Sequence, residues 1–193
     1  MGRFLRTFAP GPGTGILDVG GTPFNWSLVA QPARVTLLNP APPDPVAPLP
    51  PQLSWVRGSG TALAWPDAAF DVVFSNSVIE HLATLEEQRA FARELRRVGR
   101  GLWVQTPARG FPFEPHLLAP LVHYLPRRWQ RRLIRWCTPW GWIARPSQAA
   151  VDDFLARTRL LSGRELAELF PDCEIRRERF LGLARSYVAV RRA

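Results

Sequence analysis

The sequence predicts an α/β fold with a doubly wound, mostly parallel sheet and an antiparallel edge strand. Short apolar runs have the composition of strands buried on both faces, and they lie at 16–19, 35–38, 71–75 and 102–105. Helical patterns separate several of these runs, so strands and helices alternate along the chain. Two further strands, at 173–179 and 186–190, are close enough in sequence to pair antiparallel.

The early part of the chain contains strong turn and loop signals. The turn Gly20-Gly21 follows the first strand and leads to Pro23, a favoured first helical residue. We expect a short helix there, through Trp26 and Val29. Residues 40–51 contain seven prolines in twelve positions, which excludes a helix, so this crossover should be an extended loop before a short strand at 55–56.

Two capping boxes mark the starts of the later helices. Each is a Thr or Ser followed three residues later by Glu, at Thr84–Glu87 and Ser162–Glu165. The apolar stripes that follow have helical spacing and should face the sheet; they comprise Phe91, Leu95 and Val98, then Leu166, Leu169 and Phe170. Gly99 and Gly101 should end the first of these helices.

Length and composition indicate one globular domain over residues 1–193, with residues 108–160 as a cap or substrate insertion. No apolar run approaches the roughly 18 residues of a membrane span. The N-terminal segment is broken by Arg and Pro and lacks the apolar region of a signal peptide. Cys137 and Cys173 have no metal-like spacing, and we expect reduced thiols, no metal and a cytoplasmic location.

Small and polar residues follow two of the predicted strands. TGILDVGG (14–21) ends in a glycine turn, and FDVVFSNSVIEHL (70–82) ends in Ser and Asn before EHL. Carboxyl ends of parallel strands meet at one edge of the sheet, so the pair predicts a nucleotide-type pocket. A dinucleotide is disfavoured because Gly20-Gly21-Thr22-Pro23 breaks the G-x-G-x-x-G spacing and Asn39 replaces the expected acid.

The segments ILDVGG, LLN, GSGTALAWPDAAFDVVFSNSVIEHL and GLWVQTP together resemble class I S-adenosylmethionine-dependent methyltransferases. They are most similar to small bacterial members with an LPF-PD-x-x-FD-V-V motif before the fourth strand and EHL after it. The resemblance runs from about residue 15 to 107, and the final helix and two strands also fit. TPARGFPFEPHLLAPLVHYLP, further on, is similar to a sub-group. The resemblance implies a Rossmann-like fold and S-adenosyl-L-methionine as cofactor.

The resemblance also implies which residues form the cofactor site: Asp18, Gly20, Gly21, Asn39, Ser59, Gly60, Ser75, Asn76 and Ser77. Asp18 and Gly20 would shape the pocket under the methionine part, and Ser59 and Gly60 would contact adenine. Three positions depart from the family pattern. Thr22 replaces a second glycine, Asn39 replaces the acid that holds the ribose, and Ser59 replaces an aspartate. An amide at position 39 can still donate and accept hydrogen bonds.

The resemblance raises one question about the N-terminus. Relatives often have a helix ahead of the first strand. About 14 residues precede that strand here, and we expect these to be too few for a helix plus a connection.

The cofactor's sulfonium already activates the methyl group, so the protein mainly has to align an acceptor. If the acceptor must lose a proton, the candidate bases are His81, Glu114 and His116. Glu114 and His116 flank Pro115 in a segment that should lie over the edge of the pocket. Each could instead have a structural role, His81 at a helix start and the other two within their loop. His123 is a weaker candidate, nearer its own helix.

The segment 127–145 is rich in Arg and Trp. All 25 basic residues of the chain are Arg, and residues 108–150 hold seven of them against Glu114 alone, which concentrates the net charge of +9 there. An apolar stripe of Trp129, Leu133, Trp136 and Cys137 lies opposite a basic stripe of Arg128, Arg131, Arg132 and Arg135, with Trp140 and Trp142 following. This pattern fits an anionic membrane surface or lipid substrate, RNA, or a cap helix packed on the domain.

The sequence therefore predicts methyl transfer from S-adenosyl-L-methionine to an unidentified acceptor, a small molecule or a lipid-linked metabolite. Two alternatives remain open: a non-catalytic membrane-surface or scaffold protein that keeps the fold, and an RNA methyltransferase. RNA is disfavoured because the rest of the chain is almost neutral, whereas RNA-binding proteins often spread positive charge around the pocket. Peripheral contact with the inner membrane face is a further possibility, and the oligomeric state is left open.

Overall fold

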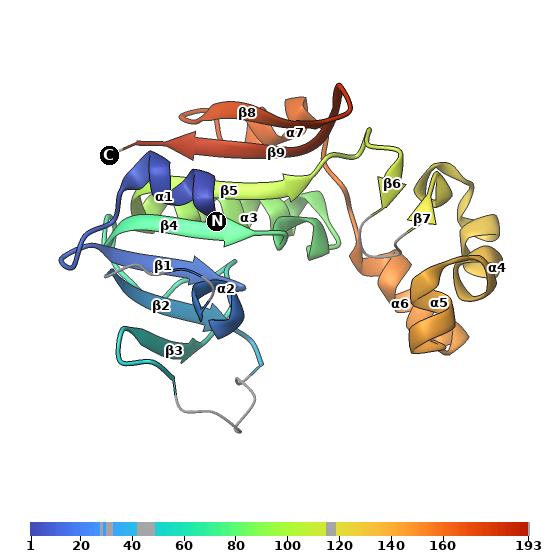
Figure 1. The fold of residues 1–193 in the computed structure, drawn as a ribbon, viewed down its shortest axis with the longest axis horizontal. Coiled ribbons are helices and arrows are strands. Elements are labelled where there is room, and N and C mark those ends of the chain that lie inside the picture. The colour runs from blue at the N-terminus through green and yellow to red at the C-terminus, as the bar shows by residue number, and fades with distance from the viewer. Residues whose placement is uncertain (28, 30–32, 42–48, 115–118, 193) are drawn as a thin grey trace.

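A seven-stranded sheet forms the centre of the computed structural model, which describes residues 1–27, 29, 33–41, 49–114 and 119–192 (Figure 1). The strand order is β3-β2-β1-β4-β5-β9-β8. The strands are β1 (Gly15–Val19), β2 (Arg34–Asn39), β3 (Leu53–Arg57), β4 (Phe70–Asn76), β5 (Gly99–Pro107), β8 (Glu174–Phe180) and β9 (Leu183–Arg191). The predicted class is confirmed: a mostly parallel sheet with an antiparallel edge.

The order of the strands determines where a ligand can bind. The sheet is parallel from β3 through β5, and β9 then runs antiparallel to both β5 and β8. The chain moves from β1 outward to β2 and β3, then returns to β4 on the other side of β1. The order therefore reverses between β1 and β4, and ligands of open α/β sheets bind at such a point, beyond the carboxyl ends of the strands.

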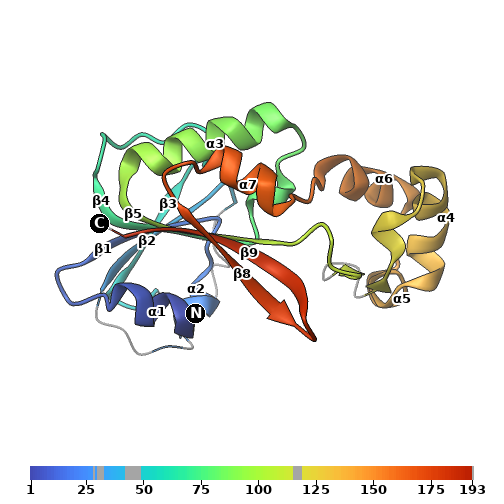
Figure 2. The ribbon, with the colours of Figure 1, turned by 90° about the horizontal axis from the view of Figure 1, so that it is seen from above.

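Helices cover both faces of the sheet (Figure 2). One face carries α3 (Leu85–Val98) and α7 (Gly163–Leu169), and the other carries α1 (Gly2–Phe8) and α2 (Pro23–Ser27). The two predicted capping boxes are both present, at Thr84 of α3 and Ser162 of α7. The predicted stripes of both helices are buried in the core on their side of the sheet. The helix after the glycine turn is shorter than expected, because α2 ends at Ser27 and leaves Val29 outside it.

The expectation that the N-terminus is too short for a helix is wrong. Helix α1 needs only seven residues, and its connection to β1 is a short segment containing Pro10 and Pro12. Phe4 anchors this helix, since its ring is fully buried and meets Trp26, Phe74 and Trp103 edge-on at centroid distances of 6.1, 4.9 and 5.9 Å. Edge-to-face aromatic packing of this kind adds to the burial of apolar area, so Phe4 is the main anchor of the helix, with Leu5 and Phe8 packed against the same core.

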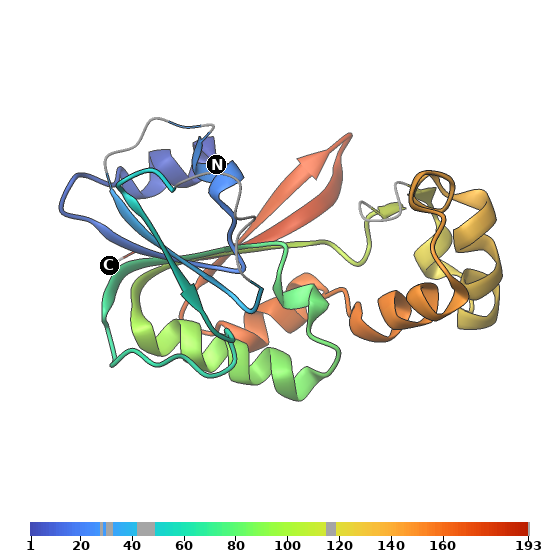
Figure 3. The same ribbon diagram turned by 90° about the horizontal axis from the view of Figure 1, so that it is seen from below.

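A helical cap lies at the far end of the molecule, beyond the carboxyl end of β5 (Figures 1 and 3). Its elements are β6 (Phe113–Glu114), β7 (Ala119–Pro120), η2 (Val122–Tyr124), α4 (Arg127–Cys137), α5 (Pro139–Ala144) and α6 (Gln148–Arg157). The cap has a small core of its own, formed by Ala119, Val122, Ile134, Val151 and Leu155. In the described part of the chain, no helix is long and apolar enough to cross a bilayer.

Replacing Phe4 with alanine tests the docking of α1. The truncation leaves a cavity beside the rings of Trp26, Phe74 and Trp103, so we expect the free energy of unfolding to fall by about 3–5 kcal/mol, measured by urea denaturation. Phe24→Ala is the matched control, because the Phe24 ring is 67% exposed and should cost less than about 0.5 kcal/mol. Equal effects of the two substitutions would contradict the packing of this helix.

Candidate functional site

The turn after β1 brings the backbone close to the carboxyl end of β4. Gly20 has φ +78°, and a Cβ on it would lie 2.5 Å from Cγ2 of Val78. Its amide N–H donates to the carbonyl oxygen of Leu38 at 2.7 Å, which ties the turn to β2. Only glycine satisfies both the positive φ and the lack of space.

Asp18 lies directly under this turn. Its side chain is buried and accepts a hydrogen bond from Nε1 of Trp26 at 2.7 Å. A Cβ on Gly21 would lie 2.0 Å from the carboxylate, so the second glycine makes room for the acid. Burial raises the pKa of Asp18 to about 7, and the bond from Trp26 opposes that shift.

The residues expected to hold the ribose and adenine lie at the ends of β2 and β3. Asn39 Nδ2 is 3.4 Å from the carbonyl oxygen of Gly21, and its Oδ1 accepts from the amide of Ala41. Ser59 is exposed, and its hydroxyl lies 2.8 Å from Oγ1 of Thr61. A Cβ on Gly60 would lie 2.5 Å from the Phe91 ring, so this position also requires glycine.

The three polar residues at the end of β4 occupy different environments. Ser75 is fully buried, and its hydroxyl donates to the carbonyl oxygen of Val19 at 3.1 Å, which joins β4 to β1. Asn76 is exposed at the strand end. Ser77 has φ +56°, and its hydroxyl bonds Oε1 of Gln105 at 3.1 Å on the β5 side. The Ser75 hydroxyl thus links β4 to β1 inside the sheet, whereas the polar groups of Asn76 and Ser77 lie at the edge of the sheet where a ligand could reach them.

The candidate bases are only partly described. His81 is exposed in η1 (Ile79–His81). The backbone of Glu114 forms part of β6, but its side chain and the whole of His116 lie outside the described residues. His123, ranked lowest from the sequence, is half-buried in η2 and stacks on Tyr124 at 4.1 Å between ring centroids. No group of His, Cys, Asp and Glu among the described residues could hold a metal ion.

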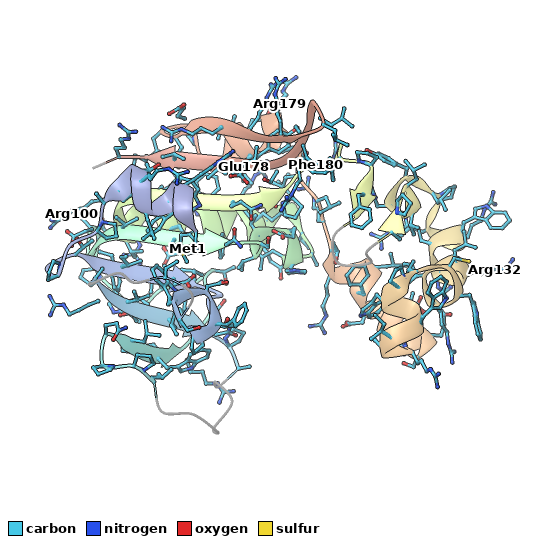
Figure 4. The ribbon with its side chains drawn as sticks, in the orientation of Figure 1. Met1, Arg100, Arg132, Glu178, Arg179 and Phe180 are labelled. Atoms are coloured by element: carbon cyan, nitrogen blue, oxygen red, sulfur yellow. The ribbon has the colours of Figure 1, made fainter. Side chains whose placement is uncertain are left out.

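A cavity of about 490 Å³ lies between the end of β5 and the cap. Most of its exposed lining is apolar, with a few polar groups, and it includes Ser77, Gln105, Phe111, Phe113, His123, Phe180 and Arg185. Phe111 and Phe180 meet edge-on at 6.4 Å. Figure 4 shows Phe180 at the end of the β8–β9 hairpin nearest the cap. We call this space the aromatic cavity. Apart from Ser77 and His123, these residues carry no functional signal in the sequence, because their grouping depends on tertiary structure.

The predicted stripe of Trp129, Leu133, Trp136 and Cys137 is not the packed face of α4. Gln130 and Ile134 are the buried residues of this helix, while Trp136 is 69% exposed and Trp129 48%. The helix also ends at Cys137, and α5 begins after Thr138 and adds the exposed side chains of Trp142 and Ile143. The packed-cap interpretation is therefore wrong for this stripe: α4 packs through its neighbouring face and leaves the tryptophans at the surface.

Comparisons with known proteins agree with this geometry. Residues 18–101 match a family model described as a methyltransferase domain. The fold resembles the 1,6-didemethyltoxoflavin-N1-methyltransferase of Burkholderia thailandensis at 15% identity, covering 98% of this chain and 73% of that one, with TM-score 0.60. It also resembles a SAM-dependent methyltransferase from Aquifex aeolicus at 14% identity, covering 98% of this chain and 87% of that one, with TM-score 0.52. A further SAM-dependent methyltransferase, from Methanosarcina mazei, is similar at 12% identity, covering 97% of this chain and 95% of that one, with TM-score 0.57. No curated protein matches significantly.

The fold and the strand-end turn define a Rossmann-like protein with a nucleotide-type ligand site at the β1–β4 edge. Residues 18–101 match a methyltransferase domain, and the fold is that of S-adenosylmethionine-dependent methyltransferases such as those of Aquifex aeolicus and Methanosarcina mazei. The residues present fit S-adenosyl-L-methionine as a ligand. Gly20, Gly21 and Gly60 lack the side chains that would fill the turn and the neighbouring loop, and the exposed polar side chains of Asn76 and Ser59 lie at the same edge of the sheet.

The pH dependence of stability tests the burial of Asp18. Its pKa rises from 3.8 to about 7 on folding, so between these values the folded state keeps a proton that the unfolded state releases. Stability contributed by this group is therefore present at low pH and is lost as pH rises toward 7, by at most roughly 1.4 kcal/mol per pH unit. We expect Asp18→Asn to gain stability relative to the wild type between pH 5 and 8 in urea denaturation. Trp26→Phe removes the hydrogen bond that favours the ionised carboxylate, so the loss of stability should continue to higher pH. If the difference in stability between Asp18→Asn and the wild type does not change with pH, the burial of this acid is contradicted.

Proposed function

We propose that the protein transfers the methyl group of S-adenosyl-L-methionine to an acceptor bound in the aromatic cavity. The observation that carries this proposal is the position of Ser77. It directly follows β4, whose carboxyl end borders the glycine turn, and it also lines the aromatic cavity. The cofactor site and the cavity therefore adjoin at one strand end, which is the arrangement that direct transfer requires.

The cavity suits an acceptor with a flat apolar body. Phe111, Phe113 and Phe180 provide aromatic surface, and the Gln105 amide adds a polar group whose position is held by the hydroxyl of Ser77. The Burkholderia thailandensis relative is described with 1,6-didemethyltoxoflavin and S-adenosylhomocysteine bound. A small-molecule acceptor with an apolar or aromatic body is our preferred substrate class for this chain.

The bound cofactor supplies an electrophilic methyl group, and the protein has to hold the acceptor atom in line with it. Where that atom carries a proton, the imidazole of His123 is the candidate acceptor for it, because His123 lines the aromatic cavity. His81 is a weaker candidate than its position in the sequence suggests, since its side chain is exposed and it does not line the aromatic cavity. We retain Glu114 and His116 as further candidates on their sequence spacing alone, because the side chain of Glu114 and the whole of His116 lie outside the described residues.

Calorimetry with S-adenosyl-L-methionine and S-adenosylhomocysteine tests the cofactor site. We expect binding in the micromolar to sub-millimolar range. Thr22→Trp should weaken it at least tenfold, because Thr22 is exposed directly after the glycine turn and a large ring there would fill the site without an internal clash. Gly110→Val is the control, since a Cβ on Gly110 meets no atom within 4 Å. Absence of binding to either compound would refute the enzymatic function and favour the non-catalytic alternative.

We also propose that the cap contacts anionic membrane surfaces. Supporting this are the exposed tryptophans of α4 and α5 and the nearby basic residues Arg128, Arg132, Arg135 and Arg145, which form no ion pair with the described carboxylates. The centroid of the Trp136 ring also lies 5.2 Å from the Arg135 guanidinium carbon. The backbone carbonyl oxygen of Trp136 accepts a hydrogen bond from Nε1 of Trp142. Aromatic rings beside guanidinium groups suit an interface with acidic headgroups.

Vesicle flotation tests this second proposal. The wild-type protein should float with phosphatidylglycerol vesicles, and Trp129→Ala with Trp136→Ala should reduce the bound fraction at least fivefold by removing the interfacial rings. Phe24→Ala, an exposed aromatic change on the main domain, should bind like the wild type. Undiminished flotation of the double variant would rule out this surface. Nucleic acid that survives a high-salt wash would instead favour RNA.

A further inference from the structure

A second cavity, of about 260 Å³, lies between the cap and the main domain. We call it the basic cavity. Its lining includes Arg109 from the segment after β5, Arg127 from the first turn of α4, and Thr158 and Arg159 from the segment after α6. It shares His123 and Leu160 with the aromatic cavity, so the two spaces adjoin.

The charges around the basic cavity do not balance. Glu165 pairs with both Arg109, at 3.3 Å, and Arg159, at 2.6 Å. Arg127 has no carboxylate partner among the described residues, and its guanidinium donates to the carbonyl oxygen of Leu155. Among the described residues, three guanidinium groups therefore stand beside one carboxylate, which two of them share, and this leaves an excess of two positive charges. No Asp or Glu lines the cavity itself among the described residues.

A buried hydroxyl adds a second, independent observation. The Oγ1 atom of Thr158 is shielded from solvent and has no hydrogen-bond partner among the described residues, although Thr158 lines the basic cavity. An unsatisfied buried hydroxyl is unfavourable, and buried polar groups normally have a partner. A ligand oxygen in the cavity would supply one.

We propose that the basic cavity binds a phosphate group of the methyl acceptor, whose apolar or aromatic body occupies the aromatic cavity. A phosphate monoester carries up to two negative charges near neutral pH, which matches the excess of two positive charges. Arginine forks bind phosphate oxygens in pairs, and the hydroxyl of Thr158 can donate to a third oxygen. This inference rests on the proposed function, because it assigns the aromatic cavity to the acceptor.

Calorimetry of the full chain with phenyl phosphate, inorganic phosphate and phenol tests the pairing of the two cavities. We expect phenyl phosphate to bind at least tenfold more tightly than either of the others. Short-chain phosphatidic acid forms a fourth arm: tighter binding than phenyl phosphate would assign the phosphate to a lipid, and weaker binding to a soluble aromatic compound. Equal binding of phenyl phosphate and phenol, or no binding of any phosphate, would overturn the proposal.

Two variants and one control locate the phosphate. Arg127→Gln should weaken phenyl phosphate binding at least tenfold, whereas Arg128→Gln, at the next position of α4 and outside both cavities, should change it less than twofold. Thr158→Val replaces the hydroxyl with a methyl group of similar size, so it should weaken binding about threefold or more without lowering the melting temperature. Equal losses in the two arginine variants would indicate general attraction and overturn the site.

Cofactor binding, measured on the same preparations, separates this inference from the proposed function. Arg127→Gln should bind S-adenosylhomocysteine as the wild type does, because the basic cavity does not border the glycine turn. Phosphate binding without cofactor binding would refute the methyltransferase function but would still support the basic cavity as a phosphate site. Cofactor binding without phosphate binding would refute the inference alone.

Discussion

The buried Asp18 carboxyl is the contact on which the cofactor end of the sheet depends. It fills the space that a side chain on Gly21 would need, and it accepts from the indole of Trp26 in the next helix. Trp26 in turn meets the rings of Phe4 and Phe74. One carboxyl group therefore joins the first strand, the glycine turn, two helices and the aromatic core on that face. Its burial raises its pKa, and a cationic ligand above the turn would favour its ionised form.

The regular elements were predictable because local signals agree with the tertiary structure. Short apolar runs became the central strands, and Thr84 and Ser162 begin their helices as the capping boxes require. The N-terminal helix was missed because its stability comes from packing: Phe4 is the only fully buried residue of α1, and no side chain caps the helix start. A single buried ring gives no periodic signal in a sequence.

Sequence patterns indicate the glycine positions of the candidate site but not its cavities. Gly20, Gly21 and Gly60 are positions whose geometry demands glycine, so a motif can reveal them. Ser75 shows the limit of that approach, since a polar residue at a strand end can be buried in a cross-strand hydrogen bond. The stripe of α4 was assigned to the wrong environment for a related reason. Helical periodicity identifies faces, but only the packing partners decide which face is covered.

The division of the site between sheet and cap explains why the cofactor was easier to identify than the acceptor. The family match covers residues 18–101 and includes the glycine turn, whereas most of the aromatic cavity is formed by residues from Gln105 onward. The arginines of the cap likewise fall into two groups that only the fold distinguishes. Arg127 lines the basic cavity and Arg128 does not, because neighbouring residues of a helix point about 100° apart. Net charge could locate the basic segment, but only the fold separates arginines that face a ligand cavity from arginines that face outward.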